Sequence, residues 1–242
     1  MSESRLHGKT ALITGSTQGL GLAAATQFRA AGCRIVDNGF VDGKYVGADL
    51  RSPAEIEAMI KAAGPIDILI NNAVVRHSAL IENFGQDHWD EAIAVNLSAA
   101  FHTIRLALPA MKERGWGRIL NVSSIYGQRG AANRVGYVTT KTALIGLTRA
   151  VALEVVGSGV TCNAVCPGTT ETPVHEAAIQ ALMTAGGLSR NAAERAFMAG
   201  KQPTGRIIAA DDVAQLMVFL CGPASADING SIFPIDAGWS AG

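Results

Sequence analysis

Tyr137 and Lys141, one helical turn apart, are the pair in this sequence best suited to acid–base chemistry. An i, i+4 spacing places both side chains on one face of a helix, about 6 Å apart. Tyrosine is a poor base at neutral pH, but a neighbouring ammonium stabilises the phenolate and lowers its pKa. The same spacing also occurs in surface pairs, so the prediction of a proton-transfer site depends on the residues around it.

Two polar residues upstream strengthen this prediction. Ser124 ends the apolar segment RILNVSS, thirteen residues before Tyr137. Strand ends at the carboxyl edge of a parallel sheet face the ligand crevice, where a hydroxyl can hold a carbonyl or alcohol oxygen. Asn96 lies in the long helix before this strand, where it either binds a backbone carbonyl or a water linked to Lys141, or is an ordinary interior amide.

A glycine-rich loop forms a second candidate site. TGSTQGLG (14–21) lies between an apolar run and an Ala-rich helix. Its glycines let the backbone approach a pyrophosphate, and the helix N-terminus offers free N–H groups and a positive dipole. The spacing GxxxGxG differs from the common GxGxxG and is not a P-loop. An ordinary strand-to-helix turn is the alternative, but the position near the N-terminus favours a nucleotide.

The end of the second strand indicates which dinucleotide is bound. An acidic residue there binds ribose hydroxyls, and a basic one accepts a 2′-phosphate. Gly39 and Phe40 occupy the position that selects the cofactor. The absence of Arg or Lys there favours NAD over NADP. Asp37 lies two residues before that position and is interpreted as a solvated residue at the strand end. Asp49 is either an acceptor for the adenine amino group or a helix N-terminal acid ahead of Pro53.

Alternating strands and helices must position these residues. Short β-branched runs, most of them bounded by Gly or Pro, predict the strands Lys9–Thr14, Arg34–Asn38, Tyr45–Ala48, Ile66–Asn71, Arg118–Ser123, Val160–Val165 and Ser231–Ile235. Longer Ala-rich segments predict the helices Gly19–Ala31, Pro53–Ala63, His88–Met111, Tyr137–Val156 and Asp211–Leu220. This alternation predicts an α/β, doubly wound parallel sheet of the Rossmann type.

The whole chain, 1–242, is expected to form one catalytic domain. The link Gly39–Lys44 is too short for the usual crossover helix. The stretch 169–203 lacks a strand and contains Gly186 and Gly187, so it is predicted to be a helical flap over the substrate.

Composition excludes several classes of protein. Twenty basic and twenty acidic residues give no net charge, which argues against a nucleic-acid binder or a polybasic membrane protein. A hydrophobic content of 48% excludes disorder, and no apolar run is long enough for a membrane helix. The four cysteines show no CxxC spacing, which predicts free thiols in a reducing compartment. The five histidines show no ligand spacing, which predicts that there is no catalytic metal. No signal peptide is visible, so a cytoplasmic protein is expected.

TGSTQGLG (14–21), NNA (71–73), Asn96, Ser124, YVTTK (137–141) and Pro167-Gly168 together resemble the short-chain dehydrogenase/reductase family over essentially the whole chain. The resemblance implies a seven-stranded sheet of order 3-2-1-4-5-6-7, a nicotinamide cofactor and a homotetramer built on two long helices. It also implies roles: Tyr137 as general acid/base, Lys141 as its pKa-lowering partner and ribose ligand, Ser124 orienting the substrate oxygen, and Asn96 supporting a proton relay.

The resemblance likewise supplies the expected cofactor contacts. Asn71 is expected to line the cofactor together with Gly15, Thr17, Gln18, Gly19, Leu20, Gly21, Gly39, Phe40, Asp49, Leu50, Asn72, Ala73, Tyr137, Lys141, Pro167, Gly168, Thr170 and Thr172.

Within the family, segments such as NGF (38–40) and KQPTGR (201–206) are similar to bacterial D-3-hydroxybutyrate dehydrogenases, which use NAD. The substrate positions differ: Val74, Arg76, Tyr126, Arg134 and Thr169 replace the Gly, amide, His, Lys and Trp expected there. Arginine suits a carboxylate or phosphate. Arg76 and Arg134, with Tyr126, Thr169 and His175, are therefore the expected substrate residues, and His77 and Arg129 are expected nearby; solvated surface arginines are the alternative.

The sequence thus predicts an NAD(H)-dependent oxidoreductase that acts on a secondary alcohol or ketone of a small anionic or polyhydroxylated compound. An NADP-dependent ketoreductase is the alternative within the same class. A non-catalytic dinucleotide sensor or scaffold is the alternative of another class, but it has no need of a tuned tyrosine.

Overall fold

A computed structural model describes residues 6–41 and 44–241. Its centre is a six-stranded sheet of order β2-β1-β5-β6-β7-β8, in which all neighbouring strands run parallel. The strands are β1 (Thr10–Ile13), β2 (Arg34–Asp37), β5 (Ile68–Asn71), β6 (Gly117–Val122), β7 (Val160–Pro167) and β8 (Ile232–Ile235). The expectation of a doubly wound Rossmann-type sheet is confirmed.

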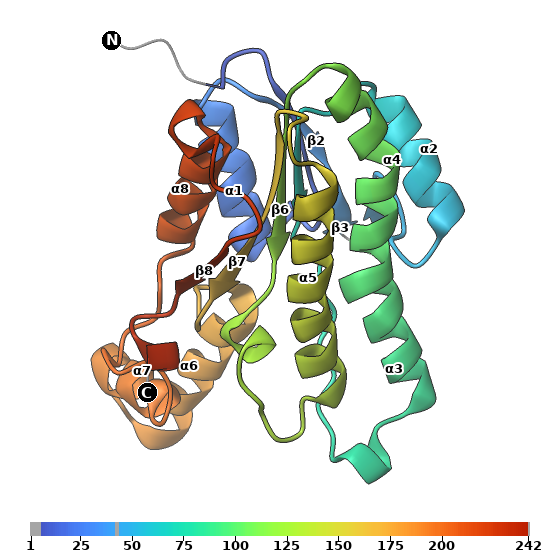
Figure 1. Cartoon of the computed structure of the whole chain (residues 1–242). Helices are drawn as coiled ribbons and strands as arrows, with labels where there is room; N and C mark the ends of the chain where they lie inside the picture. The colour runs from blue at the N-terminus through green and yellow to red at the C-terminus, as the bar shows by residue number, and fades with distance from the viewer. Residues whose placement is uncertain (1–5, 42–43, 242) are drawn as a thin grey trace.

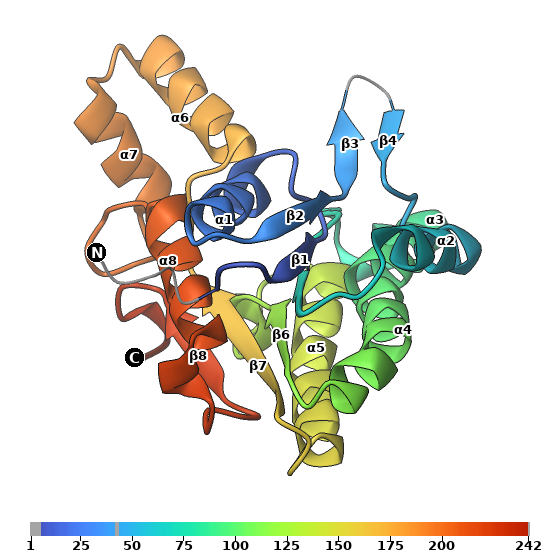
Figure 2. The same ribbon diagram turned by 90° about the horizontal axis from the view of Figure 1, so that it is seen from above.

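Helices cover both faces of this sheet, as Figures 1 and 2 show. One face carries α1 (Gly19–Ala30) and α8 (Ala210–Cys221), and the other carries α2 (Pro53–Ala63), α4 (Ala99–Glu113) and α5 (Val135–Glu154). The four central strands are buried on both faces because successive side chains alternate between two cores. Leu12 joins the core beneath α2, α4 and α5, whereas Ala11 and Ile13 join the core beneath α1 and α8.

The expected third strand of the main sheet is wrong. The predicted strand Tyr45–Ala48 corresponds to β4 (Lys44–Val46), which pairs antiparallel with β3 (Gly39–Val41) in a separate two-stranded hairpin. Parallel neighbours need a crossover of a dozen or more residues, and the link from Gly39 to Lys44 is far shorter. The described residues therefore form six strands in the sheet instead of seven, and the hairpin projects beyond it (Figure 2).

The predicted helix His88–Met111 is divided into three parts. α3 (Gln86–Ile93) passes through a π-helical turn, η2 (Ala94–Ser98), into α4. Such turns often occur at functional sites because they re-aim one side chain. Here the turn contains Asn96.

The predicted flap region contains two helices, α6 (Pro173–Gly186) and α7 (Arg190–Met198), which lie together beside the sheet (Figure 1). Thr172 caps α6 by accepting from the His175 N–H, and Pro173 occupies its first turn. Gly187 ends α6 in the left-handed conformation, at φ 60°.

Candidate active site

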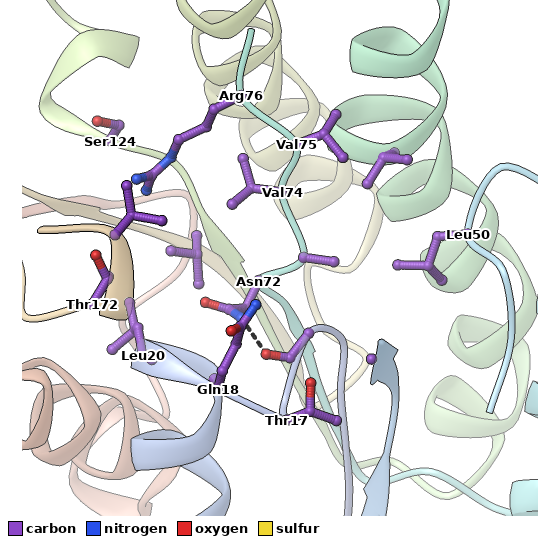
Figure 3. Close-up of a pocket in the computed structure, with 18 of the residues that line it drawn as sticks. Thr17, Gln18, Leu20, Leu50, Asn72, Val74, Val75, Arg76, Ser124 and Thr172 are labelled. Atoms are coloured by element: carbon purple, nitrogen blue, oxygen red, sulfur yellow. Dashed lines mark hydrogen bonds between the residues drawn. The ribbon is translucent and has the colours of Figure 1, made fainter. Parts of the chain in front are cut away.

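A pocket of about 570 Å³ lies at the carboxyl edge of the sheet (Figure 3). It is lined by the glycine loop, the ends of several strands, and the beginnings of α5 and α6. Most predicted site residues line it: Gly15, Thr17, Gln18, Gly19, Leu20, Gly21, Gly39, Asp49, Leu50, Asn72, Ala73, Arg76, Ser124, Tyr137, Lys141, Pro167, Gly168, Thr170, Thr172 and His175.

The glycine loop, residues 14–21, encloses a hollow that we name the glycine cradle. A larger side chain at its glycine positions would fill that hollow. A Cβ on Gly21 would lie 2.0 Å from the carbonyl oxygen of Gly15, which itself has φ +67°. The Asn72 amide fixes the loop by donating to the carbonyls of Thr14 and Gly15, at 3.0 and 3.2 Å. At the start of α1, Gln18 makes no side-chain capping bond within the described chain, so the first-turn N–H groups face the pocket uncapped. This geometry fits a pyrophosphate.

Hydrogen bonds and an ion pair hold the end of β2, next to Asn38 and Gly39, which line the pocket. The Asp37 carboxylate accepts from the Ser16 hydroxyl at 2.9 Å and pairs with Arg29 at 2.9 Å. Asp37 is thus partly exposed to solvent, with 39% of its side chain accessible, and it also carries these two contacts. A Cβ on Gly39 would lie 2.4 Å from the hydroxyl oxygen of Thr17, so only glycine leaves Thr17 in place. The side chain of Phe40 lies outside the described residues.

A chain of charges borders the pocket near Asp49. The Asp49 carboxylate accepts from the Arg51 guanidinium, with its shortest contact at 2.6 Å. Arg51 also lies 3.7 Å from Glu91, and Glu91 is 2.8 Å from Nε2 of His77. Asp49 is thus paired with an arginine, which neither sequence interpretation foresaw. Arg51 and Glu91 line the pocket but were not predicted, because the contact between them joins segments that lie far apart in the sequence.

Lys141 is buried at the centre of the site, with 2% of its surface exposed. Its Nζ donates to the carbonyl of Val122 at 2.7 Å, and the Ser123 hydroxyl donates to the backbone carbonyl of Lys141, also at 2.7 Å. Burial lowers the pKa of this lysine to about 7, with a smaller contribution from the positive charge of Arg76. Ser123 lines the pocket and was not predicted.

Two basic side chains lie near the Tyr137 ring. The guanidinium carbon of Arg76 is 5.4 Å from the ring centre, and Nζ of Lys141 is 5.8 Å from it. In Figure 3 the Arg76 side chain extends from the segment of Val74 toward Ser124. The structure therefore brings Arg76 to the tyrosine on which the predicted chemistry depends.

Ser124 and Tyr126 form the wall beside Tyr137. The Ser124 hydroxyl accepts from the Tyr126 N–H at 3.2 Å and begins the turn η3 (Ile125–Gly127). The Tyr126 ring meets Tyr137 edge-on at 6.3 Å and Trp239 edge-on at 5.5 Å. Burial raises the pKa of Tyr126. Tyr126 is half-buried and is not among the residues that line the pocket, although its ring contacts that of Tyr137.

Asn96 is a clamp on the neighbouring segment. Its Oδ1 accepts from the Val75 N–H at 2.8 Å, and its Nδ2 donates to the Val75 carbonyl at 3.0 Å and to the Thr140 hydroxyl at 3.3 Å. Asn96 is buried and does not line the pocket. The backbone carbonyl expected for this amide is that of Val75, the residue before Arg76.

Asn71 also lies behind the pocket. Its Nδ2 donates to Asn121 at 2.9 Å, and its Oδ1 accepts from Thr103 at 2.7 Å. The Asn71 amide therefore makes its hydrogen bonds inside the core, and Asn71 is absent from the pocket lining. The expectation that it lines the cofactor site is wrong.

The first residues of the flap enclose the opposite side of the pocket. Nδ1 of His175 bonds to the Thr170 carbonyl at 2.7 Å. Burial lowers the pKa of His175, and the charges of Arg76, Lys201 and Arg134 lower it further. Thr169 does not line the pocket, because it is buried and its N–H donates to the Gln202 side chain.

The other basic residues expected near the substrate, Arg134, Arg129 and His77, lie in three different surroundings. Arg134 precedes α5 and lies outside the pocket lining, whereas Arg129 donates to the Trp239 carbonyl. His77 pairs with Glu91 and stacks on His88, with 4.0 Å between the ring centres. Sequence reasoning noted Val74 as a substrate position, and the pocket lining it missed consists of Asn38, Ala48, Arg51, Val75, Glu91, Val95, Val122, Ser123, Pro173 and Val174. Among these residues, Arg51 and Glu91 carry charge.

In the described ranges, no three His, Cys, Asp or Glu residues are grouped to hold a metal, and all four cysteines are buried and unpaired. One helical run, Gln86–Glu113, is long and apolar enough to cross a membrane by length and composition alone. A core helix of a water-soluble protein meets the same criterion.

Residues 9–182 match the sequence model of the short chain dehydrogenase family. The D-beta-hydroxybutyrate dehydrogenase of Cupriavidus necator is 42% identical over 256 residues, covering 98% of this chain and 99% of the relative. The 2-keto-3-deoxy-L-fuconate dehydrogenase of Xanthomonas campestris is 35% identical, covering 98% of this chain and 82% of the relative. Among solved structures, L-sorbose reductase of Gluconobacter frateurii, complexed with NADPH and L-sorbose, superposes with a TM-score of 0.92 at 26% identity, covering 99% of each chain.

Proposed function

Because this chain belongs to the short-chain dehydrogenase/reductase family of oxidoreductases, which act on hydroxyl and keto groups, we propose that it is an NAD(H)-dependent enzyme that interconverts a secondary alcohol and a ketone. The observation that carries this proposal is one pocket that joins the glycine cradle to Ser124, Tyr137 and Lys141. A dinucleotide on the cradle would reach these three side chains. When bound, its nicotinamide supplies the acceptor for the hydride that leaves the carbinol carbon.

Side chains of the protein bind the substrate oxygen and transfer the proton. Ser124 lines the pocket beside Tyr137 and holds the oxygen of the alcohol. Tyr137 accepts the hydroxyl proton during oxidation and returns it during reduction. Lys141 carries positive charge close to the tyrosine and binds ribose, and Asn96 supports the site by holding Val75. Alcohol oxidation thus transfers one hydride to the cofactor and one proton to Tyr137.

NAD is the proposed cofactor. Support comes from Gly39, two residues after β2 and next to the Thr17 side chain, and from the pairing of Arg51 with Asp49 and Glu91. Two carboxylates beside Arg51 partly offset the positive charge that would attract a 2′-phosphate. NADP is the alternative, supported by the NADPH in the related L-sorbose reductase. Relative rates with the two cofactors distinguish these alternatives.

The substrate is a small anionic or polyhydroxylated compound. The relatives named for hydroxybutyrate and 2-keto-3-deoxy-L-fuconate act on hydroxy or keto acids, which supports a carboxylate on the substrate. Arg76 lies 5.4 Å from the Tyr137 ring and is the proposed anchor for that carboxylate. Tyr126, Arg134, Thr169 and His175 stay proposed substrate residues; of these, His175 lines the pocket.

The active form of the enzyme is a homotetramer of single-domain subunits. The chain acts as one cytoplasmic catalytic domain, in which the flap of residues 169–203 closes over the substrate. Exposed apolar side chains on α4 and α5, including Phe101 and Leu153, support a homotetramer built on these helices. Analytical ultracentrifugation measures the oligomeric state.

The decisive experiment is a screen of small hydroxy acids, sugars and polyols with NAD, and with NADP in parallel, by absorbance of the reduced nicotinamide. Turnover that Tyr137→Phe lowers by about a hundredfold or more supports the proposal. Retained NADH binding by that variant shows that its pocket is intact. Unchanged turnover in Tyr137→Phe would contradict the assigned chemistry and favour the non-catalytic sensor or scaffold.

A further inference from the structure

Arg76 lies between two residues that side chains of another segment hold in place. Val75, before it, is held by the Asn96 amide through both its N–H and its carbonyl, at 2.8 and 3.0 Å. His77, after it, bonds through Nε2 to a carboxylate oxygen of Glu91 at 2.8 Å. An ionised carboxylate offers only acceptors, so Nε2 of His77 carries the hydrogen. The chain on both sides of Arg76 is therefore tied to α3 and η2.

Aromatic contacts add to the hydrogen bond of His77. Its ring stacks on that of His88, with 4.0 Å between the ring centres and 8° between the planes. Phe84 meets both rings edge-on, at 6.5 Å from His77 and 6.2 Å from His88. Phe84 also packs against the start of α5, because a Cβ on Gly136 would lie 3.1 Å from its Cζ. The next residue is Tyr137, so these rings set His77 against the helix that carries the tyrosine.

Glu91 is itself held from its other side. Its second carboxylate oxygen lies 3.7 Å from the Arg51 guanidinium, which also binds Asp49. Only 31% of the Glu91 side chain and 21% of the His77 side chain are exposed, so water competes weakly for the bond between them. A carboxylate with a partner on each oxygen has few alternative orientations. The acceptor therefore stays where His77 reaches it.

The Arg76 side chain depends on its backbone for its direction. It lines the pocket and, in Figure 3, extends from the segment of Val74 toward Ser124. In the part of the chain that the structure describes, no acidic residue forms an ion pair with Arg76. A long side chain loses conformational freedom when it captures an anion, and a fixed backbone reduces that loss.

We propose that His77 is a positioning residue for the substrate: held by Glu91 and His88, it keeps Arg76 directed at the anionic group of the substrate beside Tyr137. This inference rests on the proposed function, in which Arg76 binds that group. It assigns the bond between His77 and Glu91 a task in substrate affinity that is separate from proton transfer and from cofactor binding.

His77→Ala should weaken substrate binding selectively. We expect KM for 3-hydroxybutyrate to rise about three- to tenfold, while Kd for NADH stays within about twofold of the wild-type value. His77→Gln keeps an N–H donor for Glu91 and should recover part of the lost affinity. Ser78→Ala changes the next residue, which is exposed, and serves as the control with wild-type KM. Retained NADH binding shows that the variants are folded.

The decisive comparison removes Arg76 first. In an Arg76→Ala background, the further change His77→Ala should alter KM by less than about twofold, because no guanidinium is left to position. A general contribution of His77 to the fold would raise KM in both backgrounds alike. Equal fold-increases in the two backgrounds, or a wild-type KM in His77→Ala alone, would overturn the inference.

Binding of butyrate to the NADH-loaded enzyme gives the same comparison without turnover. His77→Ala and Arg76→Ala should each raise Kd for butyrate, and the double variant should match Arg76→Ala. Affinities that neither substitution changes would overturn the inference. Turnover that depends on Tyr137 but not on His77 would leave the proposed function standing and reject only the positioning role. Unchanged turnover in Tyr137→Phe, with the butyrate affinities in the expected order, would reject the proposed chemistry and keep that role.

Discussion

Nζ of Lys141 donates a 2.7 Å hydrogen bond to the carbonyl of Val122 at the end of β6. The lysine lies in α5, so this bond joins the helix that carries Tyr137 to the strand that precedes Ser124. Burial lowers the pKa of Lys141 to about 7, and the charge of Arg76 adds to that effect. The ammonium that supports the tyrosine is therefore held at a cost in desolvation.

Protein stability should depend on pH through this lysine. Its pKa falls from 10.5 to about 7 on folding, so between these values the unfolded chain binds more protons, and stability rises with pH. Lys141→Met should remove a rise of about 1 kcal/mol per pH unit in this window. Urea unfolding of both proteins at about pH 7.5 and about pH 9 measures the difference. An identical pH slope in the two proteins would show that Lys141 keeps its ordinary pKa.

Gly21→Ala should abolish cofactor binding. The new Cβ would lie 2.0 Å from the carbonyl oxygen of Gly15, so the loop must move away from the geometry that fits a pyrophosphate. We expect NADH affinity to fall by about a hundredfold or more, as measured by fluorescence titration. Gly130→Ala is the matched control, because a Cβ there meets open space. Equal NADH affinity in the Gly21 variant and the control would show that the phosphates bind elsewhere.

Asn96→Ala should weaken both the fold and substrate binding. Loss of the amide leaves the N–H and carbonyl of Val75 without their side-chain partner, which costs about 2–3 kcal/mol in the free energy of unfolding. The loosened segment also carries Arg76, so KM should rise. Asn96→Asp keeps an acceptor for the Val75 N–H but places a buried carboxylate oxygen against the Val75 carbonyl, so it should be at least as destabilised as Asn96→Ala. Chemical unfolding and steady-state kinetics test this order; wild-type stability in the alanine variant would refute the clamp.

Cofactor preference should change with the partners of Arg51. Glu91→Gln removes one of its two carboxylate partners and leaves the arginine more available to a 2′-phosphate. We expect kcat/KM with NADP to rise about three- to tenfold relative to NAD in this variant. Arg51→Gln in the same background should reverse the gain. A cofactor ratio that neither substitution alters would exclude Arg51 as a determinant of cofactor choice.

Local spacing accounts for what could be predicted at the site. Tyr137 and Lys141 are one helical turn apart, and Ser124 ends a buried strand, so the rules of helix and parallel-sheet geometry bring them to the same edge. The loop 14–21 is a continuous segment whose glycines must lie close to one another. Such features are determined by short stretches of sequence, which is why the two halves of the pocket were predictable.

Contacts between distant segments were not predictable in this way. Arg51 and Glu91 meet only because the turn before α2 lies beside α3, and Asn96 in the π-helical turn η2 reaches Val75. The segment Tyr45–Ala48 had the composition of a sheet strand, but the short link before it permits only an antiparallel hairpin.

By itself, the sequence determined the order of strands and helices, the glycine cradle and the Ser124, Tyr137 and Lys141 set, because each depends on backbone geometry over a few residues. Only the tertiary structure decided which charges have partners. It pairs Arg51 with carboxylates and leaves Arg76, in the described chain, facing Tyr137 without one. Charge pairing acts through space, so segments far apart in the sequence must first be folded together.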